Sequence, residues 1–165
     1  MTVFLCGFMG CGKTTVGKLA AKKLGCGFTD TDDLIVRTFD MTIPEIFDQK
    51  GEPFFRTAEA EIVKSLCGKT TVAACGGGAM LNPDTARAAI ESGSAVVFLD
   101  VPFETCYERI KDDTNRPIVV SSTRDELEAL YNTRREVYLR HSNIHIACSE
   151  SPMITADQIV QAVRK

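Results

Sequence analysis

The sequence predicts an α/β domain in which five parallel strands form a sheet covered by helices on both faces. Five short apolar runs alternate with segments of helical periodicity along the chain. A glycine-rich loop, Gly7–Thr14, joins the first apolar run to the first helical segment. The 165 residues fit a single domain, 1–165, and no internal repeat or linker divides them.

Each predicted strand is a short, mainly apolar run between turn or helix signals. TVFLC is apolar almost throughout, as in a strand buried on both faces, whereas NIHIAC alternates between apolar and polar residues. The predicted strands are residues 2–6, 27–30, 71–75, 95–100 and 143–148.

Helices are predicted where apolar residues recur every three or four positions, as Val16, Ala20 and Leu24 do. Thr123 and Thr155 each precede a glutamate or glutamine by three positions, a pattern typical of a capping box at the start of a helix. The predicted helices are 13–24, 32–38, 43–50, 53–65, 83–91, 102–110, a helix from Thr123 to about Arg140, and a last helix that starts at Thr155.

Two segments outside the strands are candidates for binding elements. The helical segments between the second and third strands form a long insertion, which we expect to be a substrate subdomain. Asp112–Ser122 is polar and has no strong period, so we expect a mobile loop there.

Composition excludes some classes of partner. The net charge of −3 gives no general drive toward nucleic acid or anionic membranes, so any anion site must be a local cluster of Lys or Arg. No apolar run reaches the roughly 18 residues needed to span a bilayer. The opening MTVFLCGFM lacks a basic region and is not interpreted as a signal peptide. The small size favours a monomer.

The cysteines predict a reducing compartment. There are seven of them, an odd number, and no CxxC pair occurs. We therefore interpret them as reduced, structural residues of a cytoplasmic protein. They are Cys6, Cys11, Cys26, Cys67, Cys75, Cys106 and Cys148.

The glycine-rich loop predicts a nucleoside triphosphate site. Gly7–Thr14 matches G-x-x-x-x-G-K-[ST] without a mismatch, directly after a buried strand and at the start of a helix. Glycines let backbone amides approach phosphate, and the helix N-terminus favours an anion. Lys13 is expected to neutralise the β- and γ-phosphates, and the Thr14 hydroxyl to bind Mg²⁺.

The remaining pattern favours a kinase of a small molecule over a GTPase switch, because no guanine-reading NKxD motif is present. Cations that could neutralise a transferring phosphoryl group occur at Arg56, Arg109, Arg116, Arg134 and Arg135. Three classes stay open at this point: a kinase of one small acceptor, a related kinase of another acceptor such as gluconate or a nucleoside monophosphate, and a nucleotide-binding module without turnover.

FTDTDDL places the carboxylates of Asp30, Asp32 and Asp33 within four positions. Alternation along the second strand and its exit predicts that Asp30 and Asp32 point the same way, at the carboxyl end of the strand beside the phosphate loop. Asp30 is expected to bind Mg²⁺ through water, because Mg²⁺ gives up its hydration reluctantly. Asp33 is expected to favour the N-terminus of the next helix.

The motifs in order resemble those of the shikimate kinase family over nearly the whole chain. The resemblance is carried by GFMGCGKTT (7–15), FTDTD (28–32), GEPFFRTAE (51–59), CGGGA (75–79), NRPI (115–118) and TRREVY (133–138). It implies ATP-dependent phosphorylation of the 3-hydroxyl of shikimate, a precursor of chorismate and the aromatic amino acids. It also implies a nucleoside-monophosphate-kinase-like fold with strand order 2-3-1-4-5, a shikimate-binding insertion at about 31–60 and a lid at about 111–124.

The resemblance also implies roles for single residues. Lys13, Asp32 and Arg116 align with catalytic residues, and Asp32 would take the acceptor hydroxyl and its proton. The implied ATP-binding residues are Gly10, Cys11, Gly12, Lys13, Thr14, Thr15, Arg109 and Arg116. The implied substrate-binding residues are Asp32, Arg56, Gly76, Gly77, Gly78 and Arg134, with Phe47 and Phe55 either walls of the substrate site or core of the insertion. Mg²⁺ would be bound by Thr14 and, through water, by Asp30.

Three positions depart from the family pattern. Cys11 stands where the family usually has serine, and Ile118-Val119 follows the lid Arg-Pro pair in place of Leu-Leu. Ser149–Met153, expected on the adenine side, lacks an arginine found in some members, so the residues that frame the adenine stay open.

Overall fold

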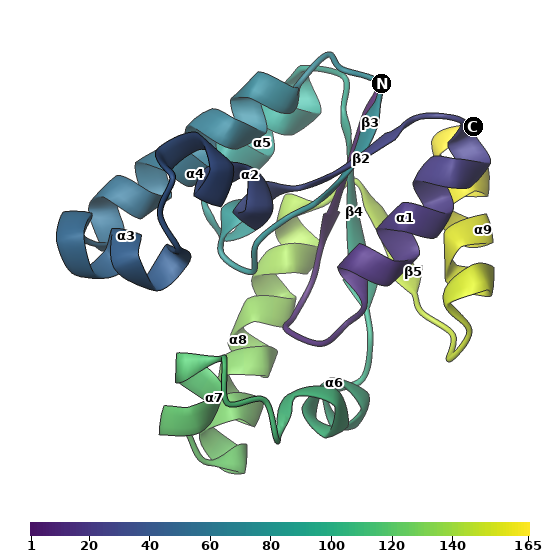
Figure 1. Ribbon diagram of the computed structural model, residues 1–165. Coiled ribbons are helices and arrows are strands. Elements are labelled where there is room, and N and C mark those ends of the chain that lie inside the picture. The colour runs from purple at the N-terminus through teal and green to yellow at the C-terminus, as the bar shows by residue number, and fades with distance from the viewer.

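The computed structural model describes all 165 residues, and it contains one parallel sheet with the strand order β2-β3-β1-β4-β5 (Figure 1). Both the parallel sheet and the order confirm the predicted fold class. β1 lies at the centre, with Leu5 paired with Ala74 of β3 on one side and with Val97 of β4 on the other. The strands are β1 Thr2–Cys6, β2 Gly27–Asp30, β3 Thr71–Ala74, β4 Ala95–Asp100 and β5 Ile144–Ala147.

Helices cover both faces of the sheet, as the continuous burial of its central strands requires. In Figure 1, α1 and α9 lie together on one side, and α2 to α4 form the projecting insertion. The helices are α1 Lys13–Leu24, α2 Thr31–Phe39, α3 Ile43–Lys50, α4 Glu52–Leu66, α5 Pro83–Glu91, α6 Phe103–Ile110, α7 Pro117–Ser121, α8 Arg124–His141 and α9 Pro152–Val163, with a short 3₁₀ turn η1 at Ala79–Leu81.

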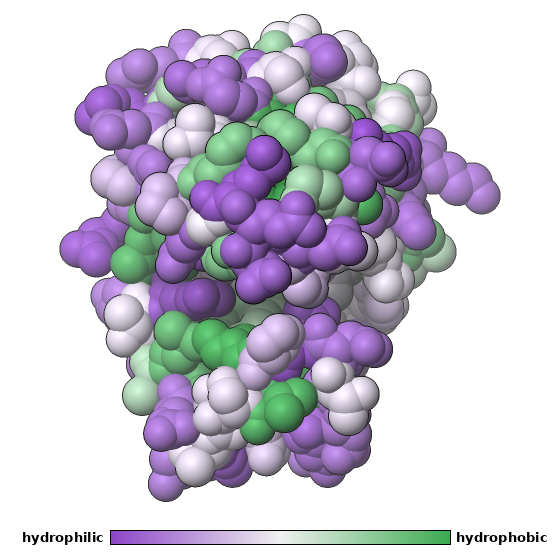
Figure 2. Space-filling model, turned by 60° about the vertical axis from the view of Figure 1, so that its left-hand side comes forward, coloured by the Kyte–Doolittle hydropathy of each residue, from purple (hydrophilic) through white to green (hydrophobic).

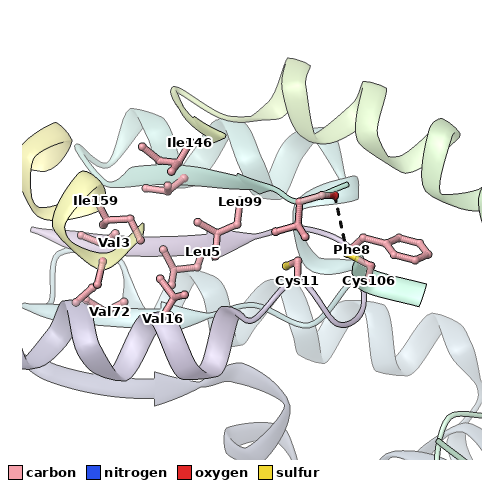
Figure 3. Close-up of a cluster of buried hydrophobic side chains, with 14 of the residues drawn as sticks. Val3, Leu5, Phe8, Cys11, Val16, Val72, Leu99, Cys106, Ile146 and Ile159 are labelled. Atoms are coloured by element: carbon pink, nitrogen blue, oxygen red, sulfur yellow. Dashed lines mark hydrogen bonds between the residues drawn. The ribbon is translucent and has the colours of Figure 1, made fainter. Parts of the chain in front are cut away.

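The core has two layers because successive side chains of β1 point to opposite faces. Val3 and Leu5 pack toward α1 and α9, where Val16 and Ile159 meet them (Figure 3). On the other face, Phe4 and Cys6 pack against side chains of α4, α5 and α8. A separate small cluster, built on the buried residues Ile35, Ile46 and Phe55, forms the interior of the insertion.

Two predicted segments differ from the structure. Residues 117–121, predicted as part of a mobile loop, form the helix α7, because Pro117 supplies the fixed φ of a first helical position. The last helix starts at Pro152, not at Thr155. The Thr155 hydroxyl instead donates to the carbonyl of Ser151 at 3.3 Å, inside the first turns of the helix. The capping box at Thr123 is confirmed, and the other bounds agree within two residues.

The sequence contains no apolar run long enough to span a membrane, and it predicts reduced cysteines. No helix of the structure has the length and apolar character that crossing a bilayer requires. All seven cysteines are free, and Cys6, Cys11, Cys75 and Cys106 are buried. On the face shown in Figure 2, polar side chains predominate and apolar side chains form only small patches between them.

An ion pair fixes α8 to the carboxyl end of β4. Asp100, the last residue of β4, accepts from Nε and Nη2 of Arg135 at 2.9 and 2.6 Å. Nε2 of His145, on β5, lies 2.9 Å from the same carboxylate. Burial of Asp100 acts to raise its pKa, but the bonds from Arg135 and His145 outweigh it and hold the pKa below its usual range.

We expect Asp100→Asn to destabilise the fold by about 1 kcal/mol at pH 7, because the bidentate pair to a half-exposed arginine is lost. A carboxyl whose pKa is lower in the folded state stabilises the fold at pH values above its unfolded-state pKa of about 3.9. That stabilisation disappears as the pH falls through the folded-state pKa. Urea unfolding should therefore show a gap between wild type and variant that is larger at pH 7 than at pH 3. Glu61→Gln, which removes an exposed pair with Lys64, should change stability little at either pH. A gap that does not depend on pH would contradict the assignment.

Candidate active site

The phosphate loop follows β1 and opens α1 with a backbone that only glycine adopts readily. Gly10 and Gly12 have φ of 77° and 92°, in the left-handed region. A Cβ at Gly10 would also lie 2.9 Å from the carbonyl oxygen of Cys106, so a side chain cannot fit there. The first helical turn closes with the Val16 amide donating to the Gly12 carbonyl at 2.9 Å.

Lys13 folds back over this loop. Its ammonium group donates to the carbonyl oxygens of Gly7 at 2.7 Å and Phe8 at 3.2 Å, and it lies 3.6 Å from Sγ of Cys11. The positive charge is thereby held against the backbone of the loop instead of extending into solvent. This arrangement favours the phosphates of a nucleotide, which suit a point charge and inward N–H groups.

Thr14 and Asp30 bring two oxygen groups together beside the loop. The Thr14 hydroxyl donates to Oδ2 of Asp30 at 3.3 Å. Oδ1 of Asp30 accepts from the amides of Asp32 and Asp33 at 3.0 and 3.3 Å, so Asp30 is also the N-cap of α2. Asp33 lies in the first helical turn as predicted, but the side chain that caps the helix belongs to Asp30.

Asp32 is placed by α2 and not by the strand. The prediction from strand alternation was wrong in its reasoning, because β2 ends at Asp30 and Asp32 is the second residue of the helix. Oδ1 of Asp32 is buried and has no hydrogen-bond partner. Burial, and next the charge of Asp30, raise the pKa of this carboxyl above its usual value. A buried acceptor without a partner is suited to receive a hydrogen bond from a ligand.

Three glycines after β3 face three charged side chains. A Cβ at Gly76 would lie 2.5 Å from Oδ1 of Asp32, and one at Gly77 would lie 3.3 Å from Nη1 of Arg134. A Cβ at Gly78 would collide with the guanidinium of Arg56. The absence of side chains at 76–78 therefore gives a carboxylate and two guanidinium groups room at the same backbone segment.

Arg56 is held by α4 itself. Its Nη1 donates to Oε1 of Glu59 at 3.0 Å, one helical turn away, and its Nε lies 3.4 Å from the carboxylate of Glu52. Glu59 is 3% exposed, and burial raises its pKa although the bond to Arg56 acts in the opposite direction. Glu59 therefore holds the guanidinium of Arg56 in place.

A cavity of about 550 Å³ lies over the phosphate loop. A recess crosses the face shown in Figure 2, above the lower end of the molecule, where Figure 1 places α6, α7 and the start of α8. Every predicted ATP-binding residue lines the cavity, and so do the predicted metal and acceptor residues Asp30, Asp32, Gly76 and Gly77. The predicted residues on its wall are Gly10, Cys11, Gly12, Lys13, Thr14, Thr15, Asp30, Asp32, Gly76, Gly77, Arg109 and Arg116.

The other predicted residues lie outside this wall. Arg56, Gly78 and Arg134 are not on the wall, although Arg134 lies against Gly77, which is, and Arg56 lies against the neighbouring Gly78. Phe47 and Phe55 are core of the insertion, with ring centroids 4.7 Å apart and Phe55 only 4% exposed. Phe55 belongs to the buried cluster of the insertion and the partly buried Phe47 packs against it, so a role of these rings as walls of a substrate site stays a prediction.

Two arginines reach the cavity from the segment after β4. Nη1 of Arg109, on α6, donates to the carbonyl of Gly10 at 2.9 Å. Nε of Arg116, at the start of α7, lies 3.0 Å from the carboxylate of Asp113, so the lid arginine is paired within its own loop.

Sequence reasoning assigned no site role to several residues of the cavity wall. Met9 lies in the phosphate loop, Val101 follows β4 directly, and Cys148 and Thr155 come from the segment after β5. Pro152 also lies on the wall, within Ser149–Met153, the segment that was expected on the adenine side.

The fold and the phosphate loop define a P-loop kinase in which charged side chains face a glycine segment beside the phosphate loop. The shikimate kinase family model matches residues 9–164. A shikimate kinase of Bacillus pumilus is 42% identical over 144 residues, covering 86% of this chain and 77% of that protein. One of Bacillus licheniformis is 39% identical over 165 residues, covering 98% and 93%. The chain belongs to the shikimate kinase family.

Solved structures agree. A shikimate kinase of Acinetobacter baumannii in complex with shikimate has a TM-score of 0.88 and 32% identity, covering 99% of this chain and 92% of that one. A gluconokinase of Sinorhizobium meliloti has a TM-score of 0.55 and 18% identity, which shows a shared fold alone.

We expect Gly78→Ala to destabilise the protein by about 1 to 3 kcal/mol. The added Cβ must displace the guanidinium of Arg56, and the buried Glu59 carboxylate then loses its partner. Gly27→Ala is the matched control, because a Cβ there meets only Thr71 Oγ1 at 3.6 Å. Urea unfolding compares the two variants, and a crystal structure of Gly78→Ala should show Arg56 turned away. Equal stability of both variants, with Arg56 in place, would refute this account.

Proposed function

We propose that this chain phosphorylates the 3-hydroxyl of shikimate with ATP and releases shikimate 3-phosphate and ADP. One observation carries the assignment beyond a general nucleotide site: Asp32, Arg134 and Arg56 converge on Gly76–Gly78 beside the phosphate loop. Shikimate is a small ring with one carboxylate and three hydroxyl groups. Two guanidinium groups suit the carboxylate, and an unpaired carboxylate suits a hydroxyl.

For the nucleotide, we propose the loop amides and Lys13 for the phosphates and Arg109 for the adenine. The lid, residues 111–124, would bring Arg116 over the transferring phosphoryl group and exclude water. Arg116 must leave Asp113 to do so, and an ion pair with half-exposed partners is weak enough to exchange.

Thr14 and Asp30 would hold Mg²⁺, since a hydroxyl and a carboxylate are the hard oxygen ligands that this ion prefers. No group of three or more His, Cys, Asp or Glu side chains is arranged to hold a metal ion by itself. The two side chains fit an ion that keeps several water molecules and also binds substrate phosphates. When bound, Mg²⁺ neutralises charge on the phosphates.

Asp32 would orient the acceptor hydroxyl and accept its proton. Burial, and next the charge of Asp30, raise the pKa of this carboxyl, and a carboxylate with a raised pKa is a stronger base than an ordinary aspartate. Positioning of the two substrates supplies most of the remaining rate, because phosphoryl transfer needs little covalent help.

The insertion, residues 31–60, would form the acceptor subdomain, with Phe47 and Phe55 as its core. Every proposed group comes from one chain, so a monomer suffices. Free cysteines suit a reducing compartment such as the cytoplasm.

The acceptor is tested by ADP release with shikimate, gluconate, AMP or no acceptor. We expect stimulation by shikimate alone. Lys13→Ala should lower that turnover at least about a hundredfold, because it removes a charge that acts on the transferring phosphates. Lys18→Ala removes an exposed lysine of the same helix and should leave turnover unchanged. Stimulation by gluconate or AMP would assign a different kinase, and no stimulation by any acceptor would indicate a binding module.

Asp32→Asn should leave the Kd of ATP within about twofold and lower kcat by about a hundredfold or more, since the amide cannot accept a proton. Asp33→Asn is the matched control, because Asp33 is an exposed carboxylate on the same helical turn. Steady-state kinetics and calorimetry of ATP binding provide the readouts. Full turnover in Asp32→Asn would remove Asp32 from the chemistry.

A further inference from the structure

We infer that Tyr138 is a positioning residue for the acceptor site and that it acts through Gly77 and Arg134. The inference rests on the proposed function, because it describes how the spacing between α8 and the glycine segment 76–78 is fixed at the site proposed for shikimate.

Arg134 and Tyr138 are one helical turn apart on α8, so their side chains leave the helix on the same face. Both reach the same residue of the glycine segment. Nη1 of Arg134 lies 3.3 Å from the place of a Cβ on Gly77, and the Tyr138 hydroxyl donates to the Gly77 carbonyl at 2.6 Å. Tyr138 therefore sets the distance between the helix that carries Arg134 and the backbone that Arg134 faces.

Arg134 needs this support because no carboxylate of the protein forms an ion pair with its guanidinium. Its neighbour Arg135 is bound to Asp100, and Arg56 is bound to Glu59, whereas the ion pairs of the structure do not include Arg134. Its guanidinium is free for a ligand, and its place depends on the position of α8.

Tyr138 lies in the packed interior between α8 and the sheet. The side chain is 1% exposed and packs on Phe98 of β4, with ring centroids 5.4 Å apart. Burial raises the pKa of Tyr138, so the hydroxyl remains protonated and can only donate to the carbonyl. A buried ring with one defined hydrogen bond suits a fixed spacer between two elements.

The glycine segment is held from two sides. The Gly76 amide donates to Oγ1 of Thr31 at 3.0 Å, which ties the segment to the helix that carries Asp32. Tyr138 ties the next residue to the helix that carries Arg134. The helix that carries the Asp32 carboxylate is thereby bonded to Gly76, and the helix that carries the Arg134 guanidinium is bonded to the adjacent Gly77.

The chain contains a natural control on the same helix. The Tyr131 hydroxyl donates to the carbonyl of Val101 at 2.7 Å, in an environment that is also buried. Val101 lines the cavity on the side of the strand that ends at Asp100, away from the glycine segment. Tyr131→Phe removes the same kind of bond without touching Gly77.

The test compares Tyr138→Phe with Tyr131→Phe and wild type by shikimate-dependent ADP release and by calorimetry of shikimate and ATP. Loss of one buried hydrogen bond predicts that Tyr138→Phe raises the Kd and KM of shikimate about three- to tenfold, with the Kd of ATP within about twofold. Tyr131→Phe should leave the Kd and KM of shikimate unchanged. Both variants should unfold cooperatively, because Nδ1 of His141 still lies 2.8 Å from the Met80 carbonyl and keeps α8 docked.

Combination with Arg134→Ala tests whether Tyr138 acts through Arg134. In the Arg134→Ala background, Tyr138→Phe should raise the Kd of shikimate by a smaller factor than in wild type. A general loss of stability would instead raise the Kd of shikimate and the Kd of ATP together, and measuring both constants distinguishes it from the positioning role.

The outcomes separate the two claims. An unchanged Kd and KM of shikimate in Tyr138→Phe, or equal effects of the two tyrosine variants, would overturn the positioning role while wild-type turnover upholds the proposed function. Absence of shikimate-dependent turnover in wild type would overturn the proposed function and this inference with it.

Discussion

The parallel pairing of β3 between β2 and β1 is the constraint on which the rest of the site depends. Ala74 of β3 is paired with Asp30 of β2 on one side and with Leu5 of β1 on the other. Parallel strands end at the same edge of a sheet, so the phosphate loop, the metal candidate and the glycine segment start side by side. The two substrates of a phosphoryl transfer must meet within bonding distance, and this register brings their binding elements together before any side chain is considered.

Some charged side chains near that edge of the sheet have no partner of opposite charge in the protein. Asp32 keeps a buried oxygen without a partner, and Arg134 lies outside the ion pairs of the chain. By contrast, Asp100 and Arg135 are fully paired with each other and fix α8. The same helix thus carries one arginine that holds the structure and, directly before it, one that forms no ion pair and that we propose for the acceptor. Groups left unpaired in this way cost stability, as is usual at sites that bind ligands.

Much of the fold could be read from local patterns. The bounds of α1, α3 and α5 match the prediction because each has a strong start signal: the phosphate loop, a threonine cap and Pro83. The start of α9 was misplaced, since Thr155-x-x-Gln158 imitates a capping box while Pro152 begins the helix. α7 was missed because five residues are too few to show a period.

By itself, the sequence determined the family and predicted the nucleotide site, because the phosphate loop is contiguous and the other motifs stand in a fixed order. Only the tertiary structure decided which element carries each residue proposed for the acceptor, and where its side chain lies. Asp32 reaches the site from a helix and not from a strand, and Phe55 closes a separate core. The bond from Tyr138 to Gly77 joins residues 61 positions apart, and local periodicity carries no information about such contacts.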